Sequence, residues 1–564
     1  MKSPLIVLLL SGLLMGAGCS QAPDAVYHNG RIVPMAPGGP AEVEALSIRG
    51  ESVEAVGSSE ELLASAGPGT EVVDLEGAFV TPGLIDAHFH FTSIGLEAMQ
   101  LNFRGTASKE EVLEMVAGRA EEAAPGSWLE GRGWDQNDWP VKTFPTAADL
   151  DPVTGDHPAA FRRIDGHALW VNSRALEAAG IDASTPDPPG GQVVRDEAGR
   201  PTGVLVDDAM DLVAEEIPGP DIAALKEMAR SAVERCLALG LTGGHDAGTV
   251  PRELEAVRQL VEEDDFDFRL VSYLRWPLDG MPRPFGYETL DPYLENGPVR
   301  GLAGGRLWVP GIKMSSDGAM GSRGAALLED YSDDPGNRGL LRLTPGEMYS
   351  TVMRGAKYGF QTIIHAIGDR ANRITLDVFE RALRGLPPGD RRFRVEHSQI
   401  VHPDDVGRFG ELGVIPSMQP THATSDMYWV GDRVGEERLE GAYLWRTYLE
   451  QGLRIPGGSD APVEELDPLL GIYAAVTRQD LEGWPEGGWF GEERVSREQA
   501  LRMFTYDAAY GAFMEDAVGS LEPGKYADFV VFDRDLYRVP VRQIPGTRVL
   551  RTVLGGEEVY SGGG

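Results

Sequence analysis

The middle of this chain alternates between short apolar segments and longer amphipathic ones, and this rhythm constrains the fold more than any other feature. One helix is expected to start at Thr344 and Pro345 and to end at Gly359, because a capping residue followed by proline favours a helix start. The apolar run of residues 360–366 follows it as a buried strand. Strands that alternate with helices in this way form parallel sheets with crossover helices.

Eight segments have the character of such strands, and eight parallel strands close a barrel. They are residues 84–90, 241–247, 268–274, 309–315, 360–366, 391–397, 414–420 and 453–460. We therefore predict an α/β fold whose main unit is a (β/α)8 TIM barrel over residues 83–512. The Pro-, Gly- and Trp-rich stretch from about residue 125 to 225 falls between the first and second strands. We expect it to be an insertion over the C-terminal mouth of the barrel, where enzymes of this architecture place their sites.

Both ends of the chain have short alternating segments typical of strands. Asn29-Gly30 is a hairpin turn signal between two such segments, and Gly-rich turns recur after residue 524. Neither end alone offers enough strands to bury a sheet face. We therefore predict one small β-sandwich built from residues 19–82 and 513–564.

The first residues resemble an export signal. Lys2 precedes an apolar run over residues 4–15, which is short for a membrane span. The small residues before Cys19 resemble a bacterial lipobox, although Gly16 stands where such motifs usually carry Leu. We predict a signal peptide over residues 1–18, lipidation of Cys19, and an exported lipoprotein anchored in a bacterial cell envelope, in the periplasm or on the cell surface. The alternative is a secretory signal without lipidation.

Charge and cysteine content argue against nucleic-acid binding and against a fold that depends on disulfides. With 88 acidic and 51 basic residues the formal net charge is -37, and such a surface repels the phosphates of nucleic acids. We therefore expect no nucleic-acid partner. If Cys19 is lipidated, the one other cysteine, Cys236, has no partner, so the fold does not depend on disulfides. We expect Cys236 to be a buried small hydrophobe on a helix.

Metal-ligating residue types occur at the ends of several predicted strands. His88 and His90 are two apart at the end of the first strand, so alternation lets both imidazoles face one metal. In a barrel the C-terminal ends of the strands converge on one mouth, which would bring further candidates to the same place. The other candidate ligands are Lys313, His365, His397 and Asp460.

These strand ends resemble those of the amidohydrolase superfamily, and most closely its family 3, the N-substituted formamide deformylase-like proteins. The resemblance rests on TPGLIDAHFH, GIKMSSDGAMGSR, TIIHAIGD, RVEHSQ and GGSDAPV, and also on GRGWDQNDWP and RRIDGHALWVNS. It extends from about residue 24 to 560. The ordered set is specific, whereas substrates within this family are diverse.

The resemblance implies two divalent metal ions, which are expected to be zinc. His88, His90 and Asp460 would hold the more buried ion, and His365 and His397 the second. Lys313 would bridge both as a carbamate formed with carbon dioxide, because an ammonium cannot bind a cation. The alternative for Lys313 is a salt bridge to Asp317 or a neighbouring carboxylate, which would leave a site for one metal.

The implied chemistry is hydrolysis by a metal-bound hydroxide, with Asp460 as the catalytic proton acceptor and donor. We predict an amide or another C–N bond, other than the peptide backbone of proteins, in a small organic substrate. The alternatives are an ester, lactone or phosphoester hydrolase, and an inactive surface-binding lipoprotein. Deamination is disfavoured, because deaminases of this fold carry a Glu soon after the histidine at the position of His365. The expected partners are the substrate and, through the lipid anchor alone, a membrane; a homodimer is left open.

Weaker candidates for substrate binding lie in the insertion and after the fourth and seventh strands. For each of them, packing among aromatic side chains or surface ion pairing is the alternative. They are Trp134, Asp135, Arg163, Asp165, His167, Arg323, Gln419 and His422. His28, His157, His245 and His402 have no evident partner and are expected to be structural.

Overall fold

A computed structural model describes residues 22–136, 138–164, 168–188, 191–276 and 291–563. The predicted signal peptide, Cys19, Asp165 and His167 lie outside the described residues. Within the described ranges, no helix combines the length and the apolar character that crossing a bilayer requires.

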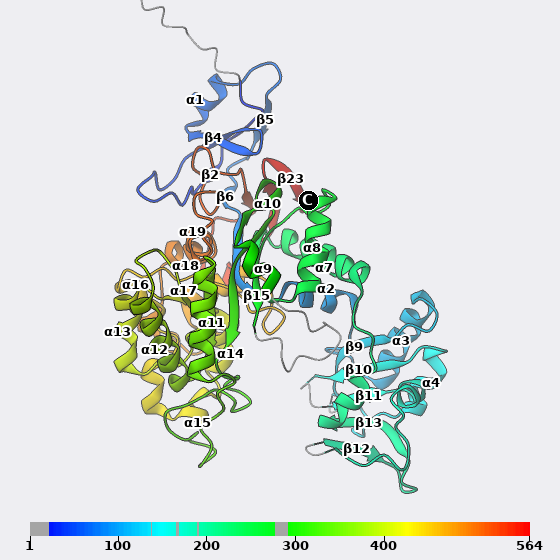
Figure 1. Ribbon diagram of the computed structural model, residues 1–564. Helices are drawn as coiled ribbons and strands as arrows, with labels where there is room; N and C mark the ends of the chain where they lie inside the picture. Colours follow the sequence, from blue (N-terminus) through cyan, green and yellow to red (C-terminus); the bar gives the residue numbers. More distant parts are fainter. Residues whose placement is uncertain (1–21, 137, 165–167, 189–190, 277–290, 564) are drawn as a thin grey trace, which may run out of the picture.

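A parallel sheet of seven strands forms the centre of the molecule (Figure 1). Neighbouring strands follow the order β20-β19-β18-β17-β15-β14-β7. A short antiparallel strand, β16 (Val299–Gly301), pairs with β17. The seven strands are β7 (Leu84–Phe89), β14 (Leu241–Thr249), β15 (Arg269–Arg275), β17 (Leu307–Ser315), β18 (Gln361–Ala366), β19 (Arg394–His397) and β20 (Ile415–Ser417).

The eighth expected strand, residues 453–460, is not a regular strand, and that prediction is wrong. Pro456 has no N–H to donate to a ladder, which explains the irregularity. The segment still joins both edges of the sheet: Met418 N–H donates to the Pro456 carbonyl at 3.0 Å, and Ala87 N–H donates to the Gly457 carbonyl at 2.9 Å. We call residues 453–460 the closing segment, because it makes the sheet nearly a closed barrel.

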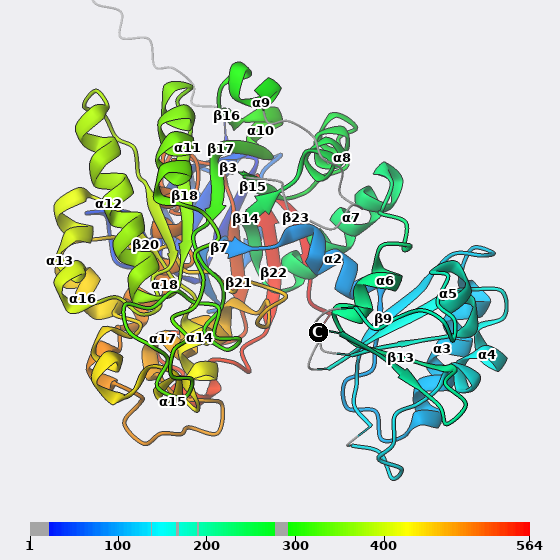
Figure 2. The same ribbon diagram turned by 60° about the horizontal axis from the view of Figure 1, so that its bottom comes forward.

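Helices cover the outside of this sheet (Figure 2). Several begin with a side-chain cap, as α11 does, where Thr344 and Glu347 form the reciprocal bonds of a capping box. They are α2 (Phe91–Met99), α7 (Ile222–Ala238), α8 (Pro251–Glu262), α9 (Asp291–Asn296), α10 (Leu302–Gly305), α11 (Pro345–Lys357), α12 (Asp369–Gly385), α13 (Pro403–Leu412), α14 (Pro420–Asp426), α15 (Val430–Val434), α16 (Trp445–Glu450), α17 (Pro468–Thr477), α18 (Arg497–Met503) and α19 (Tyr506–Gly511).

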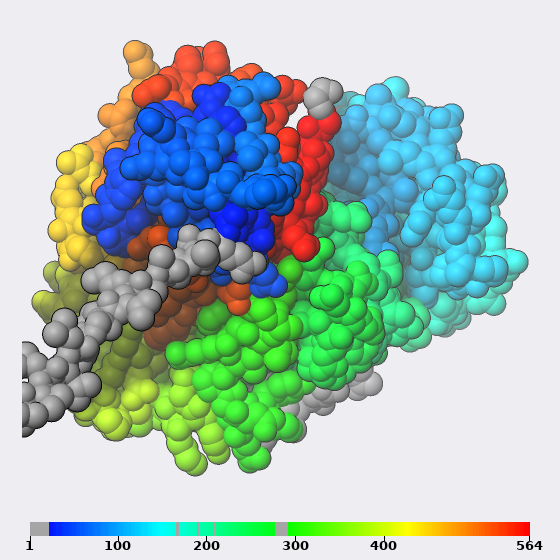
Figure 3. All heavy atoms as spheres, turned by 90° about the horizontal axis from the view of Figure 1, so that it is seen from above, coloured from blue at the N-terminus to red at the C-terminus, as the bar shows by residue number. Residues whose placement is uncertain are grey.

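The two ends of the chain lie side by side, with blue N-terminal residues against orange and red C-terminal ones (Figure 3). One sheet has the order β4-β3-β1-β5 and the other β2-β6-β21-β22-β23, so the second takes strands from both termini. Tyr27, Leu46, Phe529 and Val553 belong to one apolar cluster between them. The strands are β1 (Ala25–His28), β2 (Arg31–Ile32), β3 (Ala45–Arg49), β4 (Ser52–Gly57), β5 (Glu71–Asp74), β6 (Phe79–Pro82), β21 (Phe529–Phe532), β22 (Val549–Leu554) and β23 (Glu557–Ser561), with helix α1 (Ser59–Ala64) beside them.

The insertion forms a separate sheet beside the barrel, next to α2 (Figure 2). Its strand order is β12-β13-β11-β10-β9-β8, and it starts near residue 101 rather than at about 125. Trp134, Phe161 and Trp170 lie in its own apolar core. Its elements are β8 (Leu101–Asn102), α3 (Lys109–Glu122), β9 (Leu129–Trp134), α4 (Ala147–Thr154), β10 (Ala159–Arg163), β11 (Ala168–Val171), α5 (Ser173–Ala178), β12 (Gly191–Arg195), β13 (Pro201–Asp207) and α6 (Asp211–Ala214).

The close approach of the closing segment to β7 generates the first prediction. A Cβ atom added to Gly458 would lie 2.5 Å from the backbone nitrogen of His88, so Gly458→Ala must push the two segments apart. We expect a loss of about 1–3 kcal/mol in the free energy of unfolding, measured by urea denaturation. Gly118→Ala on α3 is the control, because nothing lies within 4 Å of its added Cβ. Equal stability of the two variants would contradict the tight contact.

Candidate metal centre

The six predicted ligands come from five separate segments and line one cavity of about 570 Å³. His88, Lys313, His397 and Asp460 are buried, whereas His90 and His365 are partly exposed. Each lies at or near the C-terminal end of its strand or of the closing segment. The structure therefore brings all six together. The side chains in question are His88, His90, Lys313, His365, His397 and Asp460.

Asp460 lies between two groups of histidines. Its Oδ1 is 3.2 Å from His90 Nε2 and 3.5 Å from His88 Nε2, and its Oδ2 is 3.6 Å from His422 Nε2. Candidate ligand atoms of His88, His90 and Asp460 lie within 4.8 Å of one another, and the same holds for His397, His422 and Asp460. One carboxylate therefore faces two potential metal positions. The ring of His365, the other predicted ligand of the second position, is centred 4.6 Å from that of His397.

The Nε2 atoms of several histidines are buried without a hydrogen-bond partner. Among the described residues that line the cavity this holds for His88, His365 and His422, and it also holds for His245, which is absent from the lining. The opposite nitrogen of His88, Nδ1, lies 2.5 Å from Glu396 Oε2, and Nδ1 of His397 lies 2.8 Å from Gln419 Oε1. A partner on Nδ1 fixes the ring and leaves Nε2 as the ligand atom, which is the usual arrangement around a bound metal. The donor set therefore fits a divalent cation.

The ionisation of these groups agrees with metal binding. Burial lowers the pKa of His88 to about 4, so its imidazole is neutral at pH 7. Burial also holds the pKa of His397 well below its usual value, and the neighbouring His365 adds to this effect. Burial opposes ionisation of Asp460, but its hydrogen bond to His90 and the surrounding histidines hold its pKa well below the usual range. Neutral imidazoles around an ionised carboxylate are the protonation states that bind a cation.

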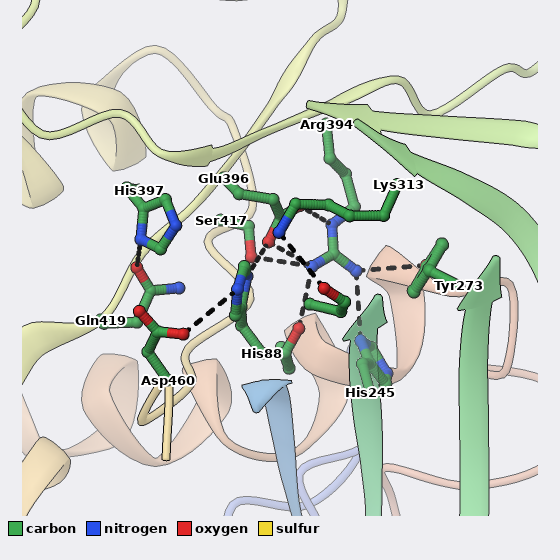
Figure 4. A network of polar contacts seen from close by, with 12 residues as sticks. His88, His245, Tyr273, Lys313, Arg394, Glu396, His397, Ser417, Gln419 and Asp460 are labelled. Atoms are coloured by element: carbon green, nitrogen blue, oxygen red, sulfur yellow. Dashed lines mark hydrogen bonds and ion pairs between the residues drawn. The ribbon is translucent and has the colours of Figure 1, made fainter. Parts of the chain in front are cut away.

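A buried ion pair supports His88 (Figure 4). Arg394 donates to both oxygens of Glu396, at 2.8 and 2.9 Å, and both side chains are fully buried. The same guanidinium donates to Ser417 Oγ at 2.9 Å and lies 3.1 Å from His245 Nδ1. Burial opposes ionisation of Glu396, but Arg394 and His88 hold its pKa far below the usual range. Glu396 therefore stays anionic and orients the His88 ring.

Lys313 has no carboxylate partner. Burial lowers its pKa to about 8, and among the described residues its Nζ makes no ion pair and donates only to the Ala247 carbonyl, at 3.4 Å. The alternative salt bridge to Asp317 does not form. Asp317 instead accepts the backbone N–H groups of Ala326, Ile367 and Gly368. A lowered pKa leaves part of the amine uncharged near neutral pH, and the uncharged amine is the form that adds to carbon dioxide.

Several of the weaker candidates lie outside the cavity lining and have partners of their own. Trp134 is fully buried in the insertion, where its indole N–H donates to the Phe161 carbonyl at 2.7 Å. Asp135 and Arg163 pair at 2.5 Å, and no described residue of the insertion lines the cavity. Arg323 binds Asp333 and likewise lies outside the cavity lining.

Two other candidates do belong to the centre, in different ways. His422 lines the cavity with its Nε2 facing Asp460. Gln419 is buried and holds His397 by the contact to Nδ1, so it positions a ligand rather than meeting the substrate.

Sequence reasoning missed Glu396, Arg394 and the part played by His245. The motif RVEH contained a signal, since a buried strand with a charged pair two residues apart requires a reason for burying both charges. Strand alternation would point Glu396 and His397 to opposite sides. The backbone of His397 resolves this with a left-handed φ of 73°, which turns its side chain toward the cavity.

The Glu396 network generates the second prediction. Glu396→Gln leaves the buried Arg394 without its counter-charge, so we expect a loss of about 3–5 kcal/mol in the free energy of unfolding. We also expect zinc affinity to fall about 10- to 100-fold, because His88 loses its orienting partner. Asp528→Asn is the matched control: it breaks the buried Arg269–Asp528 pair, whose residues are absent from the cavity lining. It should unfold more easily but keep its zinc affinity, and equal zinc loss in both variants would contradict the assignment.

Comparison with known proteins agrees with this geometry. The model of the amidohydrolase family named Amidohydro_3 matches residues 71–560. Protein LONG AFTER FAR-RED 3 of Arabidopsis thaliana is 34% identical over 527 residues, which cover 92% of this chain and 88% of that protein. The N-substituted formamide deformylase of Arthrobacter pascens is 28% identical over 536 residues, covering 91% of this chain and 94% of the deformylase.

A solved structure is similar over nearly the same length. A metal-dependent hydrolase from Pyrococcus furiosus superposes with a TM-score of 0.76 at 30% identity, and the match covers 91% of this chain and all of that one. These likenesses confirm the resemblance inferred from the strand ends and the prediction of a hydrolase acting on C–N bonds. The chain therefore belongs to the amidohydrolase family.

Proposed function

We propose that this protein hydrolyses an amide or another C–N bond of a small organic molecule, with two zinc ions held around Asp460. The observation that carries the proposal is the set of buried, unpartnered Nε2 atoms of His88, His365 and His422, with Asp460 between two histidine groups. Nitrogen and carboxylate donors suit zinc. When bound, such a pair of ions polarises the scissile carbonyl and lowers the pKa of the attacking water.

The side chains divide the remaining work. Asp460, ionised and in reach of both histidine groups, is positioned to accept the proton of the attacking water and to deliver it to the leaving nitrogen. Lys313 would take up carbon dioxide through its uncharged amine: an N–C bond forms and a proton leaves, so that the side chain becomes an anionic bridge. His88, His90, His365 and His397 would hold the ions, with His422 as a further ligand or a contact to the substrate.

The cavity walls suit a small substrate with apolar parts. Trp276, Met320, Leu343 and Trp429 line the space of about 570 Å³ outside the ligand ring. Such a volume is typical of small-molecule sites. The relative named as an N-substituted formamide deformylase makes formamides the first compounds to test.

The third prediction tests this function. Zinc-loaded protein should hydrolyse at least one member of a panel of N-substituted formamides, N-acyl amines, dipeptides, esters, lactones and phosphoesters, with an amide preferred. Asp460→Asn should lower kcat about 10²- to 10⁴-fold through loss of the proton acceptor, with an unchanged circular dichroism spectrum. Asp377→Asn, on the exposed side of α12, is the control.

Three results would contradict the proposal or part of it. Turnover of esters or phosphoesters alone would remove the C–N assignment. An absence of turnover together with an absence of bound zinc would favour a binding protein. A wild-type rate in Asp460→Asn would remove the catalytic role of Asp460.

We further propose that the protein is anchored to a bacterial cell envelope by a lipid on Cys19. The support is the sequence of residues 1–20 alone. The fourth prediction is that Cys19→Ala moves the protein from the membrane fraction to the soluble extracytoplasmic fraction, because a lipid chain supplies the only membrane contact that we expect. Immunoblots of fractionated cells would measure this. Retention of the variant in the membrane fraction would overturn the lipid anchor.

A further inference from the structure

Two arginines line the catalytic cavity without an ion pair to any described carboxylate. Arg275 is the last residue of β15, and Arg342 lies in the loop between β17 and α11. Among the described residues, neither guanidinium makes an ion pair, although the chain carries a net charge of -37 and acidic partners are plentiful. An unpaired guanidinium is costly where it is partly buried, as Arg275 is, so its place on the cavity wall points to a ligand.

The backbone fixes both arginines beside the metal ligands. Arg275 is the cross-strand neighbour of Lys313, and the N–H of the next residue, Trp276, donates to the Lys313 carbonyl at 2.9 Å. Arg342 N–H donates to the Ser316 carbonyl at 2.8 Å, which ties the loop to the end of β17. Burial and the charge of Arg342 lower the pKa of Arg275, while the nearby Glu253 and Asp246 act in the opposite direction and offset this only in part. A bound anion would relieve the repulsion between the two cations.

Three acidic side chains besides Asp460 are among the described residues that line the cavity. Asp317 follows β17, and its carboxylate is engaged by backbone N–H groups. Asp426 and Glu464 lie at the end of α14 and after the closing segment. The strand order places these segments across the barrel mouth from β15 and β17. Both carboxylates are already engaged: Asp426 accepts from Gln399 and Tyr443, and Glu464 accepts from Ser425 at 2.6 Å. The arginine side is therefore the face that remains available to a substrate anion.

We propose that Arg275 and Arg342 bind a carboxylate of the substrate, so that the enzyme prefers amides whose substituent ends in a carboxylate. This inference rests on the proposed function. Guanidinium groups match the two oxygens of a carboxylate in a planar, bidentate geometry. The metal ligands then lie between the carboxylate site and the acidic side, which would place the scissile amide near the metals and its acidic substituent against β15 and β17.

Equilibrium binding tests the carboxylate site without any need for turnover. The probes are 3-phenylpropionate and 3-phenylpropanol, which have similar shapes, differ in charge and contain no C–N bond. Calorimetry on zinc-loaded wild-type protein should give about 10- to 100-fold tighter binding of the carboxylate. Arg275→Gln and Arg342→Gln should each remove most of that preference. Arg306→Gln should keep it, because Arg306 precedes β17 at the opposite end of the strand and pairs with Asp267.

Each outcome decides one question. If the wild-type protein and all three variants preferred 3-phenylpropionate equally, the zinc ions alone would attract the carboxylate, and the proposal would be overturned. If Arg275→Gln lost zinc together with the preference while Arg342→Gln lost neither, Arg275 would serve the Lys313 carbamate instead, and the proposal would fail. Arg342 is exposed, so its variant should fold and keeps the test decisive.

The substrate screen separates this inference from the proposed function. If the protein hydrolysed neutral amides but bound both probes equally, the proposed carboxylate site would be wrong and the proposed function would stand. If the protein preferred the carboxylate probe through these arginines but hydrolysed no amide, the proposed function would be wrong and the anion site would stand. Support for both requires kcat/KM about tenfold or more higher for an N-formyl amino acid than for its methylamide, with the difference lost in Arg275→Gln.

Discussion

The ion pair between Arg394 and Glu396 underlies the geometry of the whole centre. Removing two charges from water costs several kcal/mol each, so the pair persists only because each charge has several hydrogen-bond partners. Arg394 reaches the Ala87 carbonyl, Ser417 and Tyr273 in addition to Glu396. These partners lie on β7, β20 and β15, so one guanidinium connects strands from different parts of the barrel. The position of His88 follows from this network.

The metal-facing side of the centre depends on local backbone conformations that are unfavourable for most residues. His397 has a φ of 73° and Asp460 a φ of 62°, and both are held there by the strands and the closing segment around them. Asp460 N–H donates to the His88 carbonyl at 2.7 Å, so the ligand from the closing segment is tied directly to the ligand strand β7. The eighth segment has little regular secondary structure, yet it supplies the carboxylate that both histidine groups share.

Much of the fold and the ligand set could be predicted from the sequence because both depend on local pattern. Seven expected strands are present, since each is an apolar run that ends in polar residues, and the ligands stand at those ends. Composition did not reveal that the eighth segment is irregular. Pro456 interrupts the hydrogen-bond ladder, yet the carbonyls of Pro456 and Gly457 still accept hydrogen bonds from the neighbouring strands. The sequence could not show that Trp134 and Arg163 have partners, Phe161 and Asp135, within the insertion itself. Glu396 was missed because its role depends on Arg394 and His88 meeting in space.

The central claim is that Asp460 lies between two metal ions held by side chains from separate strands. A crystal structure of the zinc-loaded enzyme, measured at the zinc absorption edge, tests it most directly. We expect two anomalous peaks about 3.5–4 Å apart, one beside His88 and His90 and the other beside His397, with Lys313 between them. A single peak, or peaks away from Asp460, would contradict the account.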